Sequence, residues 1–111
     1  GITHILCLSS VIRLPYPDRY SYLRLPLKDR GDFDLNPHLA AAVGFIEMAR
    51  QYRQGRVLVH CYQGKSRAAA VCIAYLLCLG LPLSQALSAV KETRPVVAPN
   101  MGFMKMLGVL E

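Results

Sequence analysis

The sequence lacks several features that would assign it to a special class of protein. Its longest apolar run covers residues 68–83 and contains Gly80 and Pro82, whereas a membrane-spanning helix needs about 20 predominantly apolar residues. Residues 1–10 have neither the charged start nor the long apolar stretch of a secretory signal. No internal repeat or low-complexity stretch is present. We therefore expect no transmembrane segment, no signal peptide, and one globular domain over residues 1–111.

Cysteine is also scarce, with four residues and no CxxC pair. The missing pair argues against a zinc site. Cys72 and Cys78 are six residues apart in one predicted helix, which places them on different faces. A few cysteines without an evident pairing pattern are typical of proteins in a reducing compartment, so we expect an intracellular protein in the cytoplasm, the nucleus or both. Cys61 is the exception, because it directly follows an apolar run.

Acidic residues are few, with seven Asp and Glu against 13 Lys and Arg, for a formal net charge of +6. A positive balance favours anionic partners: phosphorylated substrates, nucleic acid or an acidic membrane face. The basic residues are scattered and form no run of five or six. The charge therefore fits both a functional surface and an ordinary solvated one.

Apolar and β-branched stretches alternate with a helical pattern, and helical patterns alone follow. The predicted strands cover residues 3–9, 22–27 and 56–60, and the predicted helices cover residues 36–53, 67–79, 84–94 and a last segment after Pro99-Asn100. Asn36, before Pro37, and Ser84 are predicted N-caps. The order predicts an α/β fold with a largely parallel sheet of about four or five strands, flanked by helices on both faces.

The most informative stretch is HCYQGKSR, residues 60–67, which joins a predicted strand to a predicted helix. Cys61 would lie at the carboxyl end of the strand, in the crevice where open α/β sheets bind ligands. The backbone N–H groups of residues 62–67 can converge on an anion, and Gly64 lets the chain turn.

Arg67 adds a planar two-pronged donor that matches two phosphate oxygens. The same positive potential favours the thiolate form of Cys61, which is the nucleophilic form. A nucleophile at the floor of an anion-binding loop predicts phosphoryl transfer to sulfur.

The pattern His60-Cys61-x-x-Gly64-x-x-Arg67 resembles the signature of the cysteine-dependent protein phosphatases. The segments GITHILCLSS, VLVHC, AAAVCIAYLL and RPVVAPNMGF extend the resemblance, over essentially the whole chain, to dual-specificity phosphatase domains. The resemblance implies hydrolysis of phosphotyrosine and phosphoserine or phosphothreonine in proteins through a phosphocysteine intermediate, with no metal, no cofactor and no obligatory nucleic acid. Family domains normally carry another strand and helix before GITH, so we expect the domain over residues 1–111 to lack them.

The resemblance also implies roles for individual residues. Cys61 attacks, and the phosphate oxygens are bound by Tyr62, Gln63, Gly64, Lys65, Ser66 and Arg67. The family's general acid is an aspartate about thirty residues before the cysteine, and Asp29, 32 residues before Cys61, matches best. Asp32 is the second candidate, followed by Asp34. His60 and Asn100 are expected to support the loop.

Three features leave alternatives open. Ala68 stands where the family usually has serine or threonine, which predicts slow breakdown of the phosphoenzyme and leaves a phosphate-binding pseudophosphatase or scaffold as the rival. Lys65 is compatible with phosphoinositide substrates, and the positive charge with RNA 5′-phosphates. Cys7, on a strand expected beside the loop, is either core filler or the partner of Cys61 in a reversible disulfide. The sequence sets neither the oligomeric state nor the physiological substrate.

Overall fold

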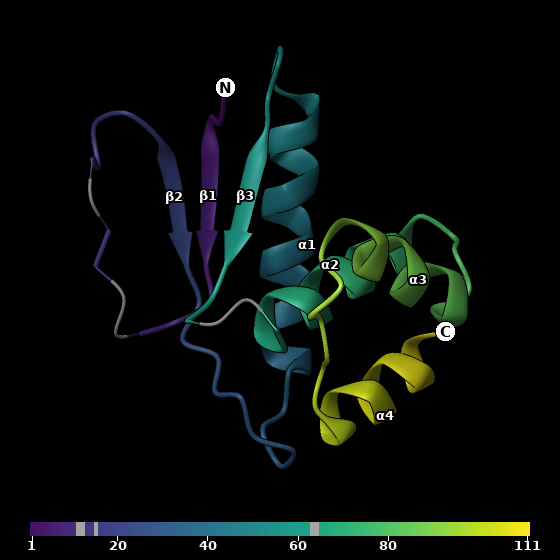
Figure 1. Ribbon diagram of the computed structural model, residues 1–111. Coiled ribbons are helices and arrows are strands. Elements are labelled where there is room, and N and C mark those ends of the chain that lie inside the picture. The colour runs from purple at the N-terminus through teal and green to yellow at the C-terminus, as the bar shows by residue number, and fades with distance from the viewer. Residues whose placement is uncertain (11–12, 15, 63–64) are drawn as a thin grey trace.

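The computed structural model describes residues 1–10, 13–14, 16–62 and 65–111. The described residues form three strands and four helices (Figure 1). In chain order these are β1 (His4–Cys7), β2 (Ser21–Arg24), α1 (Asn36–Gln51), β3 (Val57–His60), α2 (Arg67–Cys78), α3 (Leu83–Thr93) and α4 (Met101–Leu110). This confirms the predicted order of strands and helices. Within these ranges, no helix combines the length and the hydropathy needed to cross a bilayer.

The sheet has the strand order β2-β1-β3, and both pairings are parallel. Cys7 pairs with Arg24 on one side and with His60 on the other, so the carboxyl ends of all three strands meet at one edge. The parallel sheet is as predicted. The described part has three strands and not the expected four or five, because only three of its stretches have a strand pattern and Pro26 has no N–H to continue the ladder of β2.

One face of the sheet packs against helices. α1 contacts β1 and β3, and α2 contacts β3. The ring of His4 meets the edge of Phe45 at a centroid distance of 5.6 Å. The core cluster joins this face to the helices, with Leu6, Phe45, Ile46, Val71 and Ile73 among its buried members. The helices therefore cover the side of the sheet that carries His4 and Leu6.

The opposite face carries Ile5, Tyr22 and Leu58, in register on the three strands. A hollow of about 450 Å³ lies on it and is lined by these side chains and by Tyr16 and Tyr20 from the connection between β1 and β2. In the described ranges no helix covers this face, so the second predicted helix layer is not found there. The described part of the connection is irregular and includes Pro17, which favours a turn over a helix.

Two predicted N-caps are displaced toward the N-terminus, from Asn36 to Leu35 in α1 and from Ser84 to Pro82 in α3. Asn36 is the first residue of α1 and Leu35 is its N-cap, because the Asp34 carboxylate accepts the Asn36 N–H at 3.0 Å. α3 begins at Leu83 and not after Ser84, because the Glu111 carboxylate accepts the Leu83 N–H. In both helices a carboxylate from outside the helix replaces the expected cap.

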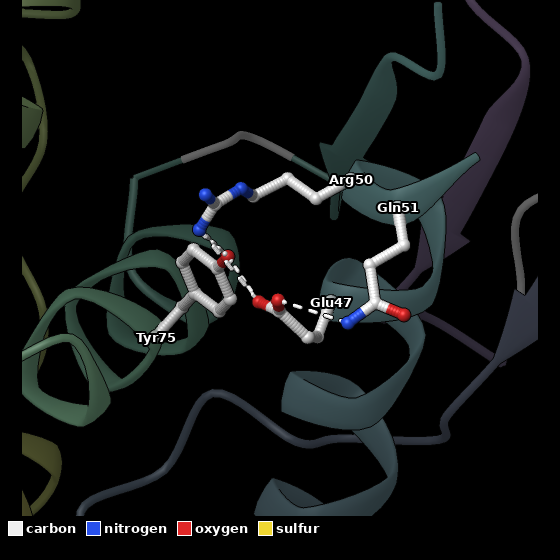
Figure 2. A network of polar contacts seen from close by, with 4 residues as sticks. All are labelled: Glu47, Arg50, Gln51 and Tyr75. Atoms are coloured by element: carbon white, nitrogen blue, oxygen red, sulfur yellow. Dashed lines mark hydrogen bonds and ion pairs between the residues drawn. The ribbon is translucent and has the colours of Figure 1, made fainter. Parts of the chain in front are cut away.

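A polar network joins α1 to α2 (Figure 2). The Tyr75 hydroxyl donates to Glu47 Oε2 at 2.6 Å and accepts from Arg50 Nη1 at 2.8 Å, while Gln51 Nε2 donates to Glu47 Oε1 at 3.4 Å. The hydrogen bond from Tyr75, and then the charge of Arg50, hold the pKa of Glu47 below its ordinary value. The network fixes α2, the helix that follows Cys61, against α1.

Candidate active site

The site lies at the carboxyl edge of the sheet. β3 ends at His60, α2 begins at Arg67, and residues 61–66 connect them. Cys61 is buried, with 7% of its surface exposed. It shares with Tyr62, Ala68 and Arg94 the lining of a groove of about 340 Å³. The nucleophile candidate therefore lies at the wall of a groove that a ligand can enter.

The connection is held from the segment between α3 and α4. The Ala98 N–H donates to the Lys65 carbonyl at 2.8 Å, and the Asn100 N–H donates to Ser66 Oγ at 3.0 Å. Lys65 and Tyr62 are exposed, whereas Ser66 is buried. The two other predicted phosphate-binding residues, Gln63 and Gly64, lie outside the described residues.

The N-terminus of α2 has no side-chain cap among the described residues. Its N-cap, Ser66, makes no capping hydrogen bond, because its hydroxyl oxygen accepts from Asn100. The first intrahelical bond runs from the Ala70 N–H to the Ser66 carbonyl at 2.8 Å. The N–H groups of residues 67–69 thus have no intrahelical acceptor, and the helix dipole adds positive potential there. This arrangement suits an anion.

Arg67 is fixed across the ends of two strands. Its Nη1 donates to the Leu27 carbonyl at 3.1 Å and to the Leu8 carbonyl at 3.4 Å. Because one terminal nitrogen holds these two carbonyls, Nε and Nη2 are the donors left for a ligand. The two carbonyls thereby hold the guanidinium in one orientation.

Arg24 is a second cation at this edge, and sequence reasoning missed it. Its Nη1 donates to the Ser9 carbonyl, one residue beyond the carbonyl that Arg67 contacts. Burial, and then the charge of Arg24, lower the pKa of His60 below its ordinary value. The sequence carried no signal for it, because the parallel register that brings the last residue of β2 to the same edge as His60 is a property of the folded sheet.

The three candidate acids have different partners. Asp29 Oδ1 accepts from Asn100 Nδ2 at 2.9 Å. Asp32 pairs with Arg30 at 3.1 Å on the surface, and Asp34 accepts the Asn36 N–H. Of the three, Asp29 is the one whose partner also bonds the connection that follows Cys61, since the Asn100 N–H contacts Ser66. The geometry therefore favours Asp29.

Asn100 joins three segments of the site. It is the N-cap of α4, and its Oδ1 accepts the Phe103 N–H at 2.9 Å. Its Nδ2 holds Asp29 and its backbone N–H holds Ser66. These bonds also fix the orientation of the amide, because the helix N–H requires the oxygen and the carboxylate requires the nitrogen.

The remaining cysteines differ from Cys61. Burial, and then the neighbouring Cys61, raise the pKa of Cys72 to about 11, so this thiol stays protonated at neutral pH. Cys7 is fully buried and its Sγ donates to the Ser9 carbonyl at 3.5 Å. All four cysteines are free thiols. A reversible Cys7–Cys61 disulfide stays a prediction. In the described ranges, no cluster of His, Cys, Asp or Glu side chains could hold a metal ion.

The sequence model of the dual specificity phosphatase catalytic domain matches residues 1–111. The chain belongs to this family. Dual specificity protein phosphatase 1 of Arabidopsis thaliana is 41% identical over the whole chain, which spans 56% of that relative. Protein phosphatase Slingshot homolog 3 of Mus musculus is 43% identical over 96% of the chain, which spans 16% of that protein. The chain thus corresponds to about half or less of these two relatives.

Solved structures of dual specificity phosphatases have the same fold. The crystal structure of human DUSP28 matches with a TM-score of 0.93 at 38% identity, covering 100% of this chain and 78% of that one. A mouse candidate dual specificity phosphatase, complexed with zinc tungstate, matches with the same TM-score and identity over 100% of this chain and 70% of that one. The family and the α/β fold expected from the sequence are both confirmed.

Proposed function

We propose that this dual specificity phosphatase domain hydrolyses phosphate monoesters of tyrosine and of serine or threonine in proteins, through a phosphocysteine intermediate. One observation carries the proposal. The uncapped N-terminus of α2 and the oriented guanidinium of Arg67 surround the connection that begins with the buried Cys61. This arrangement can bind a phosphate dianion directly beside a cysteine that can act as the nucleophile.

In the first step the Cys61 thiolate attacks phosphorus, the S–P bond forms and the P–O bond to the leaving group breaks. The first-turn N–H groups of α2 stabilise the charge on the phosphoryl oxygens, and Arg67 binds two of them through Nε and Nη2. The leaving oxygen takes a proton from Asp29. Because Asn100 Nδ2 already occupies Oδ1 of Asp29, the proton is assigned to Oδ2.

In the second step water attacks the phosphocysteine. Asp29 Oδ2, now deprotonated, takes a proton from the water, the S–P bond breaks and inorganic phosphate leaves, which restores the thiolate. Ala68 supplies no hydroxyl donor to the departing sulfur. We therefore expect this second step to limit turnover.

The tungstate complex of the mouse relative supports the proposal, because tungstate is a tetrahedral oxyanion like phosphate. We propose phosphorylated proteins as substrates, with no requirement for nucleic acid. The free state of all four cysteines supports an intracellular location, in the cytoplasm, the nucleus or both. Imaging of a fluorescent fusion in cells would test that location.

The decisive experiment measures phosphate release from p-nitrophenyl phosphate at pH 6 to 7 by the wild type, Cys61→Ser and Cys78→Ser. Cys78 is exposed at the end of α2 and serves as the matched control. We expect turnover by the wild type and Cys78→Ser, and none by Cys61→Ser. A folded wild type without turnover would contradict the proposal. In that case, retained binding of inorganic phosphate would identify a phosphate-binding pseudophosphatase. Hydrolysis of phosphoinositides or of RNA 5′-phosphates alone would instead identify that compound as the substrate class.

A further inference from the structure

The backbone of the loop that carries Asp29 passes unusually close to α4. A Cβ atom added to Gly102 would lie 1.9 Å from the Gly31 carbonyl oxygen and 2.6 Å from its carbon. The reverse substitution meets no such obstacle, since a Cβ on Gly31 would lie 3.8 Å from Gly102 N, at ordinary contact. Glycine is therefore required on the helix side of this contact.

Helix formation gives no reason for a glycine at this place. Glycine is the poorest helix former after proline, yet position 102 is the second residue of α4. The same helix carries Gly108, where an added Cβ would meet nothing within 4 Å. The two glycines of α4 thus differ in their surroundings, and only Gly102 admits another segment of backbone.

The loop lies along α4 at three points. Asp29 accepts from Asn100, Gly31 contacts Gly102, and the Leu35 N–H donates to Met106 Sδ at 3.4 Å. The contact between the two glycines is the middle one. A displacement of Gly31 therefore acts directly on the hydrogen bond between Asp29 and Asn100.

The loop, and not the helix, is the part that can yield. α4 is anchored by Phe103 and Leu107, both fully buried in the core. Asp29 and Gly31 are exposed. A Cβ at position 102 would have to move the Gly31 carbonyl by about 1 Å or more to reach an acceptable contact. Misplacement by about 1 Å can lower the rate of an enzymatic step about 10²-fold.

We propose that Gly102 is a positioning residue for proton donation by Asp29. By admitting the Gly31 backbone, it lets the loop approach α4 closely enough for Asn100 Nδ2 to hold Asp29 Oδ1. This inference rests on the proposed phosphatase function, and it assigns to Gly102 no contact with the substrate.

The test compares Gly102→Ala with Gly108→Ala on two aryl phosphates. Phenyl phosphate releases a strongly basic phenolate that requires the acid, whereas p-nitrophenyl phosphate releases a weakly basic one that requires it little. We expect Gly102→Ala to lower the single-turnover rate on phenyl phosphate about 10²-fold and on p-nitrophenyl phosphate by only a few-fold. Gly108→Ala should match the wild type on both. An equal change on the two substrates would overturn the proposal, because general misfolding would not depend on the leaving group.

A second readout does not depend on activity. In the wild type, the NMR signals of the Asn100 side-chain amide report the hydrogen bond to Asp29 Oδ1, and Asp29→Ala should shift them by removing the acceptor. Gly102→Ala should shift these signals in the same direction, whereas Gly108→Ala should leave them at the wild-type positions. If the wild type and Gly108→Ala hydrolysed neither ester, the proposed function would fail while the amide signals still decided the role of Gly102. A Gly102→Ala variant that did not fold would also contradict the proposal, because the strain would then lie in the buried anchors of α4 and not in the loop.

Discussion

The N-termini of α2 and α4 touch each other and are built in opposite ways. At α4, Asn100 caps its own helix through the Phe103 N–H. At α2, Ser66 caps nothing, because its hydroxyl oxygen accepts the Asn100 N–H. The hydrogen bond from the Asn100 N–H to Ser66 thus links the N-terminus of α4, which is capped, to that of α2, whose first-turn N–H groups have no side-chain acceptor in the described ranges.

The other two helices show that a missing N-cap side chain does not by itself mark a site. α1 and α3 also lack one, but carboxylates of Asp34 and Glu111 accept their first N–H groups. In the described part of the chain, α2 differs because no side chain takes that place. A phosphate is an acceptor of the right charge for it. The satisfied end of α4, by contrast, holds the proposed acid Asp29 and the connection that follows Cys61.

The largest effect should come from Arg67→Lys. A lysine cannot bridge the Leu8 and Leu27 carbonyls and still present two parallel donors to phosphate. We expect kcat/KM for p-nitrophenyl phosphate to fall by about 10²–10³-fold, as for the loss of one transition-state donor. Arg50→Lys, in the α1–α2 network, is the matched control and should retain activity. Equal rates for Arg67→Lys and the control would mean that the N-terminus of α2 binds phosphate without the guanidinium.

Asn100→Ala tests the N-terminus of α4, the satisfied helix end of this comparison, and should have the next largest effect. Loss of the cap should lower the free energy of unfolding by about 1 kcal/mol. Loss of the donor to Asp29 should lower turnover of phenyl phosphate about 10²-fold, as for Gly102→Ala. Asn100→Asp separates the two roles, because aspartate caps a helix well but places a like charge against Asp29. It should keep the stability and lose the turnover, as measured by chemical denaturation and by phenyl phosphate hydrolysis. Parallel losses in both variants would mean that Asn100 acts only through stability.

Much of this site was predictable because its residues are close in sequence. The stretch 60–67 contains the proposed nucleophile Cys61, Arg67 and the start of α2, and its position between β3 and α2 followed from local patterns. Asp29 was selected among three neighbouring aspartates because its distance from Cys61 matches that of the acid in the phosphatase family that the sequence resembles, and the geometry adds the Asn100 contact that distinguishes it. The parallel arrangement also followed from the alternation of strands and helix.

What the sequence did not predict depends on contacts between distant segments. Arg24 reaches the site only through the register of β1, β2 and β3. The close approach of Gly31 and Gly102 has no signature in either local sequence. The caps of α1 and α3 were misplaced because carboxylates outside the helices took the place of Asn36 and Ser84. Local propensity cannot identify a partner that the tertiary structure supplies.

Ala68→Ser, at the N-terminus of α2, should have a smaller effect than the two preceding substitutions, and it should raise turnover instead of lowering it. Ala68 is buried in the first turn and lines the groove with Cys61. A hydroxyl there would add a donor to the departing thiolate, so we expect the steady-state rate to rise several-fold and the pre-steady-state burst to become smaller. Ala69→Ser adds the same group at the next buried position and should leave the burst unchanged. A wild type without a burst, and an Ala68→Ser variant no faster, would show that breakdown of the intermediate does not limit turnover.

The smallest predicted effect concerns His60, at the opposite end of the connection from α2. Burial and the charge of Arg24 lower its pKa in the folded protein, so the unfolded chain binds more protons near the ordinary value of about 6.5. His60 therefore contributes stability that is present above pH 6.5 and is lost as the pH falls through the folded-state pKa. NMR titration of the ring should give a midpoint below 6.5, and Arg24→Gln should raise it. Arg19→Gln, which removes an exposed cation over the Tyr16 ring, should not change it. If Arg24→Gln left the midpoint unchanged, burial alone would keep His60 neutral, and the positive potential of this edge would then come from α2 and Arg67.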